Sequence, residues 1–188
     1  MPPGSYSAKL IVAGQELSRP LTIKKDPNSG GSEAEIQAQN QMLIQLRKNL
    51  DSAADMVNQI EIIRSQLDSA RTLLAGGEAG PVIRSAADEL DKKLTDVEDH
   101  LIQRRLTGSG QDGTRWPAQL MTKLAYLAGG LGSSDFGPTT QQREVQAKLE
   151  ADLALQRKRL DETLNTDLAG LNRLLRDRGV QNIVTGSP

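Results

Sequence analysis

The longest apolar periodicity in the chain runs from Ser32 to Ala75 and predicts one long amphipathic helix. Ser32 and Glu35 have the spacing of a capping box at its start, and Gly76-Gly77 provide a stop. At 1.5 Å per residue this helix is roughly 65 Å long, so other helices must lie along it. The apolar positions are Ile36, Leu43, Leu46, Leu50, Ala53, Val57, Ile60, Leu67 and Leu74, with Gln39, Arg64 and Arg71 on the skipped turns.

Three further periodic segments predict three more helices, each opened by a proline. The first runs from Pro81 to about Leu106, the second from Pro117 to about Leu131, and the third from Pro138 to Gly179. Residues 107–115 and 132–137 are expected to be loops. The apolar positions are Ile83, Ala86, Leu90, Leu94, Val97 and Leu101, then Leu120, Leu124, Leu127 and Leu131, then Val145, Leu149, Leu153, Leu160, Leu164, Leu168, Leu171 and Leu175. Four stripes with short connections predict a mainly α fold, an elongated antiparallel four-helix bundle over residues 33–179.

The first 26 residues alternate with the period of a β-strand and predict a β-hairpin before the helices. Tyr6, Leu10 and Val12 lie on the same face as Leu17 and, further on, Leu21 and Ile23. Pro20 cannot donate to a ladder, so its strand should be an edge or carry a bulge. Because two strands alone are marginal in water, the hairpin either packs on the helices or is the remnant of a β-sandwich. We favour the remnant, and its open edge predicts a weak homodimer.

The remaining boundaries follow from composition. Residues 27–32 are rich in turn-forming residues and are expected to link the hairpin to the bundle, and residues 180–188 form a C-terminal tail. The chain has 188 residues, a net charge of -1, 25% charged and 2% aromatic residues, which suits helix-on-helix packing. It has no cysteine, which excludes disulfides and thiolate chemistry. No window is apolar enough for a membrane span, and residues 1–4 lack the basic and apolar regions expected of a signal peptide.

The candidate chemical motifs all have simpler interpretations. Gly108 to Gly113 spell G-x-G-x-x-G, but a helix rather than a strand leads into them, so a loop is expected and not a dinucleotide site. His100 is the only histidine and is expected to be a partly exposed helix residue. Glu98 and Asp99 point in different directions on a helix and are expected to be solvated. We therefore predict no catalytic residue, no metal, no cofactor and no enzymatic activity.

The candidate partner-binding residues are Trp116 and Tyr126, whose rings could anchor another protein, although core packing is the simpler expectation for both. Basic residues also collect along the last predicted helix. Acidic residues are interleaved with them and no aromatic residue accompanies them, so we expect a salt-bridged exterior and no nucleic-acid surface. The basic positions are Arg157, Lys158, Arg159, Arg173, Arg176 and Arg178.

Several stretches together resemble the C-terminal region of bacterial sortilin-like β-propeller proteins with BNR/Asp-box repeats, often labelled glycosyl hydrolases. They are residues 3–10 with 19–27, residues 124–127 with 133–135 and 138–143, and residues 167–172 with 178–180. The resemblance implies that the hairpin is the last one of an immunoglobulin-like sandwich that precedes a helical tail. It also implies that the propeller, with any activity, lies upstream, so no family catalytic residue is carried onto this chain.

Two functions remain open on this evidence. The first is a noncatalytic C-terminal structural or interaction module of such a BNR-repeat protein, acting as a spacer or docking surface. Its partner would be a protein, either its own upstream domains or another chain, and the resemblance implies an extracytoplasmic location. The alternative is an autonomous helical adaptor that oligomerises through coiled-coil stripes.

Overall fold

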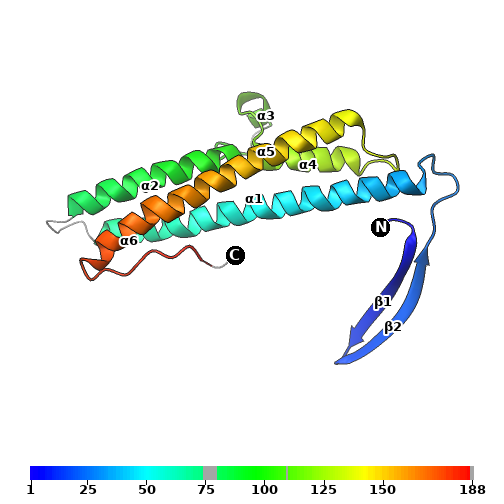
Figure 1. Ribbon diagram of the computed structural model, residues 1–188, viewed down its shortest axis with the longest axis horizontal. Coiled ribbons are helices and arrows are strands. Elements are labelled where there is room, and N and C mark those ends of the chain that lie inside the picture. Colours follow the sequence, from blue (N-terminus) through cyan, green and yellow to red (C-terminus); the bar gives the residue numbers. More distant parts are fainter. Residues whose placement is uncertain (74–79, 109, 187–188) are drawn as a thin grey trace.

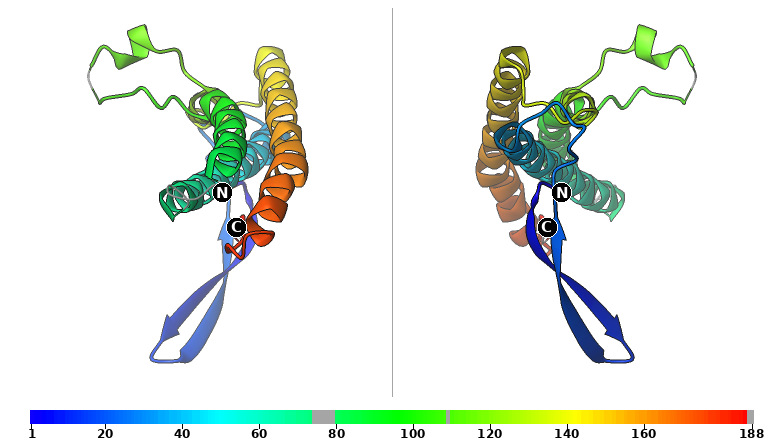
Figure 2. Two further views of the ribbon diagram at one scale, coloured as in Figure 1. Left: turned by 90° about the vertical axis from the view of Figure 1, so that its left-hand side faces the viewer. Right: turned by 90° about the vertical axis from the view of Figure 1, so that its right-hand side faces the viewer.

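The computed structural model describes residues 1–73, 80–108 and 110–186, and it is mainly helical with an N-terminal two-stranded antiparallel hairpin (Figure 1). The expected fold class is therefore confirmed at this level. The helices lie side by side in an elongated body, and the hairpin extends from one end of it (Figures 1 and 2).

The hairpin consists of β1 (Gly4–Val12) and β2 (Gln15–Ile23). Its register pairs Tyr6 with Leu21 and Leu10 with Leu17, which places the expected apolar residues on one face. The two turn residues have positive φ, 49° at Ala13 and 81° at Gly14, as a tight hairpin turn requires. Neither strand contacts any helix of the described chain. The hairpin thus leaves its apolar face open instead of packing it on the helices (Figure 1).

The long helix α1 spans Glu33–Leu73 and begins as predicted. The backbone amide of Ser32 donates to Glu35 at 2.8 Å and the amide of Glu35 donates to the Ser32 hydroxyl at 3.2 Å, so the capping box is confirmed. The predicted stop at Gly76-Gly77, and Leu74 on the predicted stripe, lie outside the described residues. The buried face is rotated slightly from the prediction and comprises Gln39, Met42, Leu46, Asn49, Ala53, Met56, Ile60, Ile63 and Leu67.

Helix α2 spans Gly80–Leu101, so its predicted continuation to Leu106 is wrong. Just beyond this end, the Arg104 guanidinium reaches back to the Glu98 carboxylate at 2.7 Å. Residues 107–115 are not all loop either, since they contain the single-turn helix α3 (Asp112–Arg115). Helix α4 spans Leu120–Leu131 and buries the four leucines expected of it: Leu120, Leu124, Leu127 and Leu131.

The last predicted helix is interrupted by a π-helical turn. It is α5 (Thr140–Thr163), then the π-helix η1 (Leu164–Leu168), then α6 (Ala169–Arg176). A capping box of Thr139 and Gln142 begins it. The predicted stripe is wrong at two places: Val145 is 46% exposed and Leu164 is only partly buried. The extra residue of a π-turn moves the buried face on by one position, which brings Leu168, Leu171 and Leu175 into the core.

The helices lie in rows that pack on one another: α1 forms one row, α2 and α4 a second, and α5, η1 and α6 a third. Helix α1 contacts α2, α4 and α5, and α5 contacts both α2 and α4. Helices α2 and α4 lie one after the other along α1, while α5, η1 and α6 run the length of the body (Figure 1). Helices α2 and α4 run opposite to α1 and α5, which run in the same direction (Figure 1), and the leucines of all the rows meet in one continuous core.

The linker and the tail both pack against the helices. A Cβ on Gly31 would lie 2.0 Å from the carbonyl oxygen of Asp135, so only glycine lets the linker approach this loop. At the other end Ile183 is buried, and its backbone exchanges hydrogen bonds of 2.9 and 2.8 Å with the Asn172 side chain. Val184 exchanges a similar pair with Gln66. The expected tail is therefore docked along α1.

Candidate functional site

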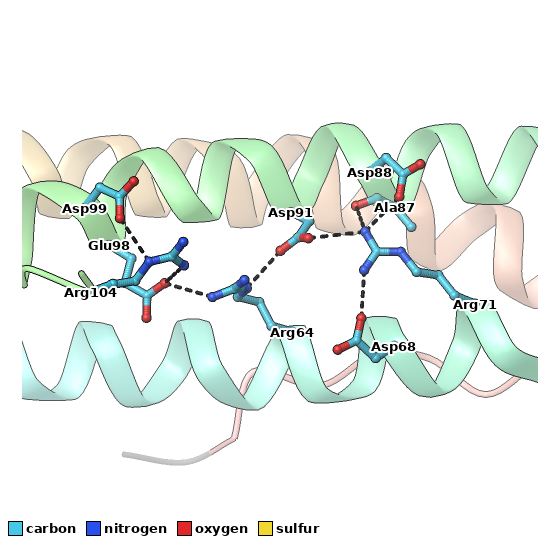
Figure 3. Close-up of polar contacts among 9 residues, drawn as sticks. All are labelled: Arg64, Asp68, Arg71, Ala87, Asp88, Asp91, Glu98, Asp99 and Arg104. Atoms are coloured by element: carbon cyan, nitrogen blue, oxygen red, sulfur yellow. Dashed lines mark hydrogen bonds and ion pairs between the residues drawn. The ribbon is translucent and has the colours of Figure 1, made fainter. Parts of the chain in front are cut away.

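A ladder of alternating charges runs along the seam between α1 and α2 (Figure 3). Arg71 bonds Asp68, Asp88 and Asp91, and Arg64 bonds Asp91 and Glu98, at 2.8 to 3.3 Å. The members lie one turn apart on α1, at 64, 68 and 71, and one and two turns apart on α2, at 88, 91 and 98, so they interdigitate at helical spacing. Asp88 therefore pairs across the seam with Arg71. The ladder fixes the register of α2 on α1.

Glu98 is fully buried at the end of this ladder, so the expectation that it is solvated is wrong. Its Oε2 accepts from Arg64 at 2.9 Å and from Arg104 at 2.7 Å, and Asp99 holds Arg104 from the other side at 3.0 Å. Burial raises the pKa of Glu98, and the neighbouring carboxyl of Glu61 raises it further, against the two arginines. Its Oε1 has no donor among the described residues. The surroundings of Glu98 therefore favour its protonated form more than water does.

His100 is exposed, as expected, and its Nδ1 lies 2.6 Å from the Asp96 carbonyl oxygen. In the described part of the chain no group of three or more histidine, cysteine or acidic side chains is arranged to hold a metal ion. The glycine motif lies beyond the loop that follows α2, and its last two residues, Asp112 and Gly113, begin α3, while Ser109 within it lies outside the described residues. Neither arrangement has the geometry of a catalytic centre.

An open and largely apolar depression of about 650 Å³ lies between α4 and α5, and we call it the α4–α5 groove. Tyr126 forms part of its wall and is 84% exposed, so the expectation that this ring packs in the core is wrong. Val145, from the opposite helix, adds an exposed apolar side chain. The groove is lined by Ala118, Thr122, Lys123, Tyr126, Leu127, Gly130, Gln141, Gln142, Val145, Lys148, Leu149 and Asp152.

Trp116 is the C-cap of α3, on the segment that projects from the side of the body (Figure 2), and it does not line the α4–α5 groove. It is half-buried and does not belong to the core, so core packing is wrong for this ring too. The Arg105 guanidinium lies 4.8 Å from the ring centroid, a cation–π contact that closes the base of the segment. The structure therefore does not bring the two candidate aromatic residues into one site.

A second, polar depression of about 820 Å³ lies between α2 and η1. Lys93 bonds Asp167 across it at 2.7 Å, and Arg159 reaches Asp96 at 3.4 Å. Arg159, one of the basic residues of the last predicted helix, is therefore in an ion pair, as the predicted salt-bridged exterior requires. The opposed charges cancel, so this depression has no single sign of charge with which to attract an ion.

The residues that line the groove together with Tyr126 could not be recognised as a site from the sequence alone. Lys123, Gly130 and Asp152 have no motif, and Val145 fits the core stripe of its helix. One signal does exist: α4 carries apolar residues on more than its buried face, including Ala125 and Tyr126. A helix that is apolar beyond the stripe facing its own core is expected to be contacted on a second side.

Comparison with protein-family models, with curated proteins and with solved structures finds no match to this chain. Among the described residues no helix is long and apolar enough to cross a bilayer. The fold and these surfaces define an elongated helical protein with an N-terminal hairpin. Its function has to be argued from its surfaces.

Proposed function

We propose that this chain is a noncatalytic structural and interaction module that acts as a spacer with a docking surface for protein. The observation that carries the proposal is the α4–α5 groove, where Tyr126 is 84% exposed beside an apolar floor. Tyrosine at an apolar surface supplies a large contact area at a low cost in side-chain entropy, which is why it is frequent where proteins bind one another.

The spacer role is supported by the length and stiffness of the helical part. Helix α1 has 41 residues, or roughly 60 Å, and is held by α2, α4 and α5 along its length. In this proposal the four helices act together as an elongated antiparallel bundle. The charge ladder and the docked tail oppose sliding of the helices past one another, because sliding would break the ion pairs of the ladder and the hydrogen bonds of the tail.

The resemblance to BNR-repeat proteins supplies the larger setting of the proposal. There the chain is the C-terminal part of an extracytoplasmic β-propeller protein, and the hairpin completes a sandwich with upstream strands. The open apolar face of the hairpin supports this, because Leu10, Leu17 and Leu21 are 57%, 62% and 47% exposed. An autonomous adaptor that oligomerises is the second candidate, and the groove supports it equally.

Site-specific photo-cross-linking in the native protein tests the docking surface. A benzophenone side chain at position 126 is expected to cross-link to a polypeptide, either an upstream domain or another chain. The matched control is position 144, where Glu144 is exposed on α5 outside the groove. Equal labelling at the two positions would show that the groove is not a docking surface.

Two further statements of the proposal are tested separately: that the chain is not catalytic, and that it belongs to a larger protein. Purified chain is expected to show no glycoside hydrolysis and no dinucleotide binding. Turnover that persists on repurification and is lost when one acidic residue is changed would contradict the first statement. The reading frame upstream of Met1 is expected to continue into a β-propeller, and an in-frame stop there would contradict the second and favour the adaptor.

A further inference from the structure

We propose that the groove holding the C-terminal tail is a binding site for an extended peptide segment, and that the tail is its internal competitor. The site lies on α1 and α6 and shares no residue with the α4–α5 groove, so this inference goes beyond the proposed function and does not depend on it. Its ligand is defined by chemistry. It has an extended backbone, an aliphatic side chain that enters the core, and a glycine three residues later.

Two side-chain amides hold the backbone of the tail, and we call them the amide clamp. Asn172 of α6 accepts a hydrogen bond from the Ile183 amide at 2.8 Å and donates one to the Ile183 carbonyl oxygen at 2.9 Å. Gln66 of α1 does the same with Val184, accepting at 2.9 Å and donating at 2.7 Å. Because every residue except proline carries this backbone donor and acceptor, the clamp binds an extended segment without reading its side chains.

The side chains of the tail supply the selectivity of the site. Ile183 is 5% exposed and Val184 is 59% exposed, so the first position must be aliphatic and the second is unrestricted. Gly186 has a φ of 69°, and an added Cβ there would lie 2.9 Å from Cδ1 of Ile62, so only glycine adopts this conformation without strain. The site therefore selects an aliphatic residue and, three positions later, a glycine.

The groove continues past the glycine of the tail. The tail runs antiparallel to α1 (Figure 1), because Val184 lies at Gln66 and Gly186 lies at Ile62. Beyond this point a depression of about 520 Å³ lies between α1 and α5, lined in part by Gln59. Gln59 lies two turns before Gln66 on the same face of α1, roughly 10 Å away, or about three residues of extended chain. An incoming segment that extends past its glycine gains contacts in this depression.

The tail occupies the site because it is tethered beside it. The turn after α6 leads directly into the tail, with Gly179 at a φ of 68° and the Val180 amide bonded to the Leu175 carbonyl oxygen at 3.0 Å. A segment tethered this closely has an effective concentration on the order of millimolar. A free peptide that makes the same contacts must therefore reach millimolar concentration to replace the tail, and it binds more strongly once the tail has left.

Binding of a peptide in trans tests the site in the full chain. The probe is a fluorescent peptide with the sequence of residues 180–186, and Ile183→Asp keeps the tail of the protein out of the core. Fluorescence anisotropy should give a dissociation constant about tenfold lower, or less, for Ile183→Asp than for the unaltered chain, because the competitor has left. Adding Gln66→Ala to this variant should weaken binding about fivefold. Adding Gln37→Ala, at an exposed glutamine near the start of α1, should not.

Two altered peptides supply the matched control for the selectivity of the site. Aspartate in place of the isoleucine should abolish binding, because a carboxylate would enter the core. Lysine in place of the following valine should leave the dissociation constant within about twofold, because the Val184 side chain is exposed when the tail is bound.

A spin label on the tail follows its displacement without altering a buried residue. The chain has no cysteine, so Val184→Cys provides a single labelling position, and that position is exposed. The label should be restrained in the protein alone and should become mobile when unlabelled peptide reaches about millimolar concentration. The aspartate peptide should leave it restrained. If Ile183→Asp loses helix content by circular dichroism, this measurement decides alone.

Four results would overturn the proposal. They are a label that is mobile before any peptide is added, a folded Ile183→Asp chain that binds no peptide at millimolar concentration, equal affinity of the peptide for the Ile183→Asp and unaltered chains, and equal affinity for the isoleucine and aspartate peptides. None of these results affects the α4–α5 groove, because the cross-link at position 126 tests that surface separately.

Discussion

Single buried leucines are expected to carry much of the stability of the helical body. Leu160 is fully buried on α5, next to Arg159, whose contact with Asp96 at 3.4 Å is exposed. Leu160→Ala should lower the free energy of unfolding by roughly 2 to 5 kcal/mol, because it removes buried area and leaves a cavity. Arg159→Ala should change it by about 0 to 1 kcal/mol. Urea denaturation measures both, and equal midpoints would show that α5 faces the other way.

The buried carboxyl of Glu98 makes stability depend on pH. Its raised pKa means that the folded chain keeps a proton that the unfolded chain loses above the ordinary value of 4.5. The stabilising contribution of this proton is complete below that value, and it is lost as the pH rises through the raised pKa.

Glu61→Gln tests this account of the Glu61–Glu98 pair. A glutamine amide can donate a hydrogen bond to an ionised Glu98, which the Glu61 carboxylate cannot, so the pKa of Glu98 should fall toward its ordinary value. Unfolding free energy at pH 7 should rise by about 1 kcal/mol, and its decline between acidic and neutral pH should become shallower. Glu144→Gln, an exposed change of the same charge, should do neither. Parallel pH profiles for Glu61→Gln and the unaltered chain would show that Glu61 does not raise the pKa of Glu98.

Two glycines with opposite surroundings show how local space decides the effect of one methyl group. Gly31→Ala forces a Cβ to within 2.0 Å of the Asp135 carbonyl oxygen, so the linker must move, at a cost of roughly 1 to 3 kcal/mol. Gly129→Ala meets nothing within 4 Å and should gain about 0.5 to 1 kcal/mol from helix propensity. Thermal unfolding should therefore shift in opposite directions, and a shift of equal sign would contradict the close approach of linker and loop.

At the scale of elements, the hairpin should be separable from the helices. Neither strand contacts a helix, while the linker after residue 26 stays docked through Gly30 and Gly31. Deletion of residues 1–26 should leave the helical circular dichroism signal per helical residue unchanged and the unfolding free energy within roughly 0.5 kcal/mol. Loss of the helical transition would mean that the hairpin belongs to the helical core, and that the chain is one α+β domain.

The π-helix shows how one extra residue within an element changes what the rest of it buries. Regular spacing from Gln156, Leu160 and Thr163 would next bury Asp167, whereas Leu168 is buried instead. Asp167 is thereby turned outward, where it accepts a hydrogen bond from Lys93 at 2.7 Å. The π-helix thus avoids burying the Asp167 carboxylate, and it keeps the apolar side chains of α6 in the core.

At the scale of the whole molecule, the elongated form should be visible in solution. A compact domain of this length has a radius of gyration of about 16 Å. Helices that run side by side for roughly 60 Å, with a hairpin extending from one end, should give a clearly larger value by small-angle X-ray scattering at low concentration. A scattering profile of a compact sphere would contradict the arrangement of the rows.

The sequence was sufficient for features whose causes lie within a few residues. The capping box at Ser32, the alternation of the hairpin and the leucine stripe of α4 are all local, so spacing alone predicts them. Even so, the buried face of α1 was misplaced by part of a turn. Met42, Met56 and Ile63 are as apolar as the residues chosen, and only the positions of the neighbouring helices decide between them.

Tertiary structure decided every feature that depends on distant partners. Glu98 is buried because Arg64, 34 positions away, and Arg104 neutralise it there. The tail is ordered because Gln66 bonds Val184 across 118 positions. Tyr126 is exposed because α5 lies to one side of it and leaves the groove open. Periodicity along one helix indicates which side of it favours burial. The free energy of burying a charge, or of leaving a ring in water, depends on what the rest of the chain places beside that side chain.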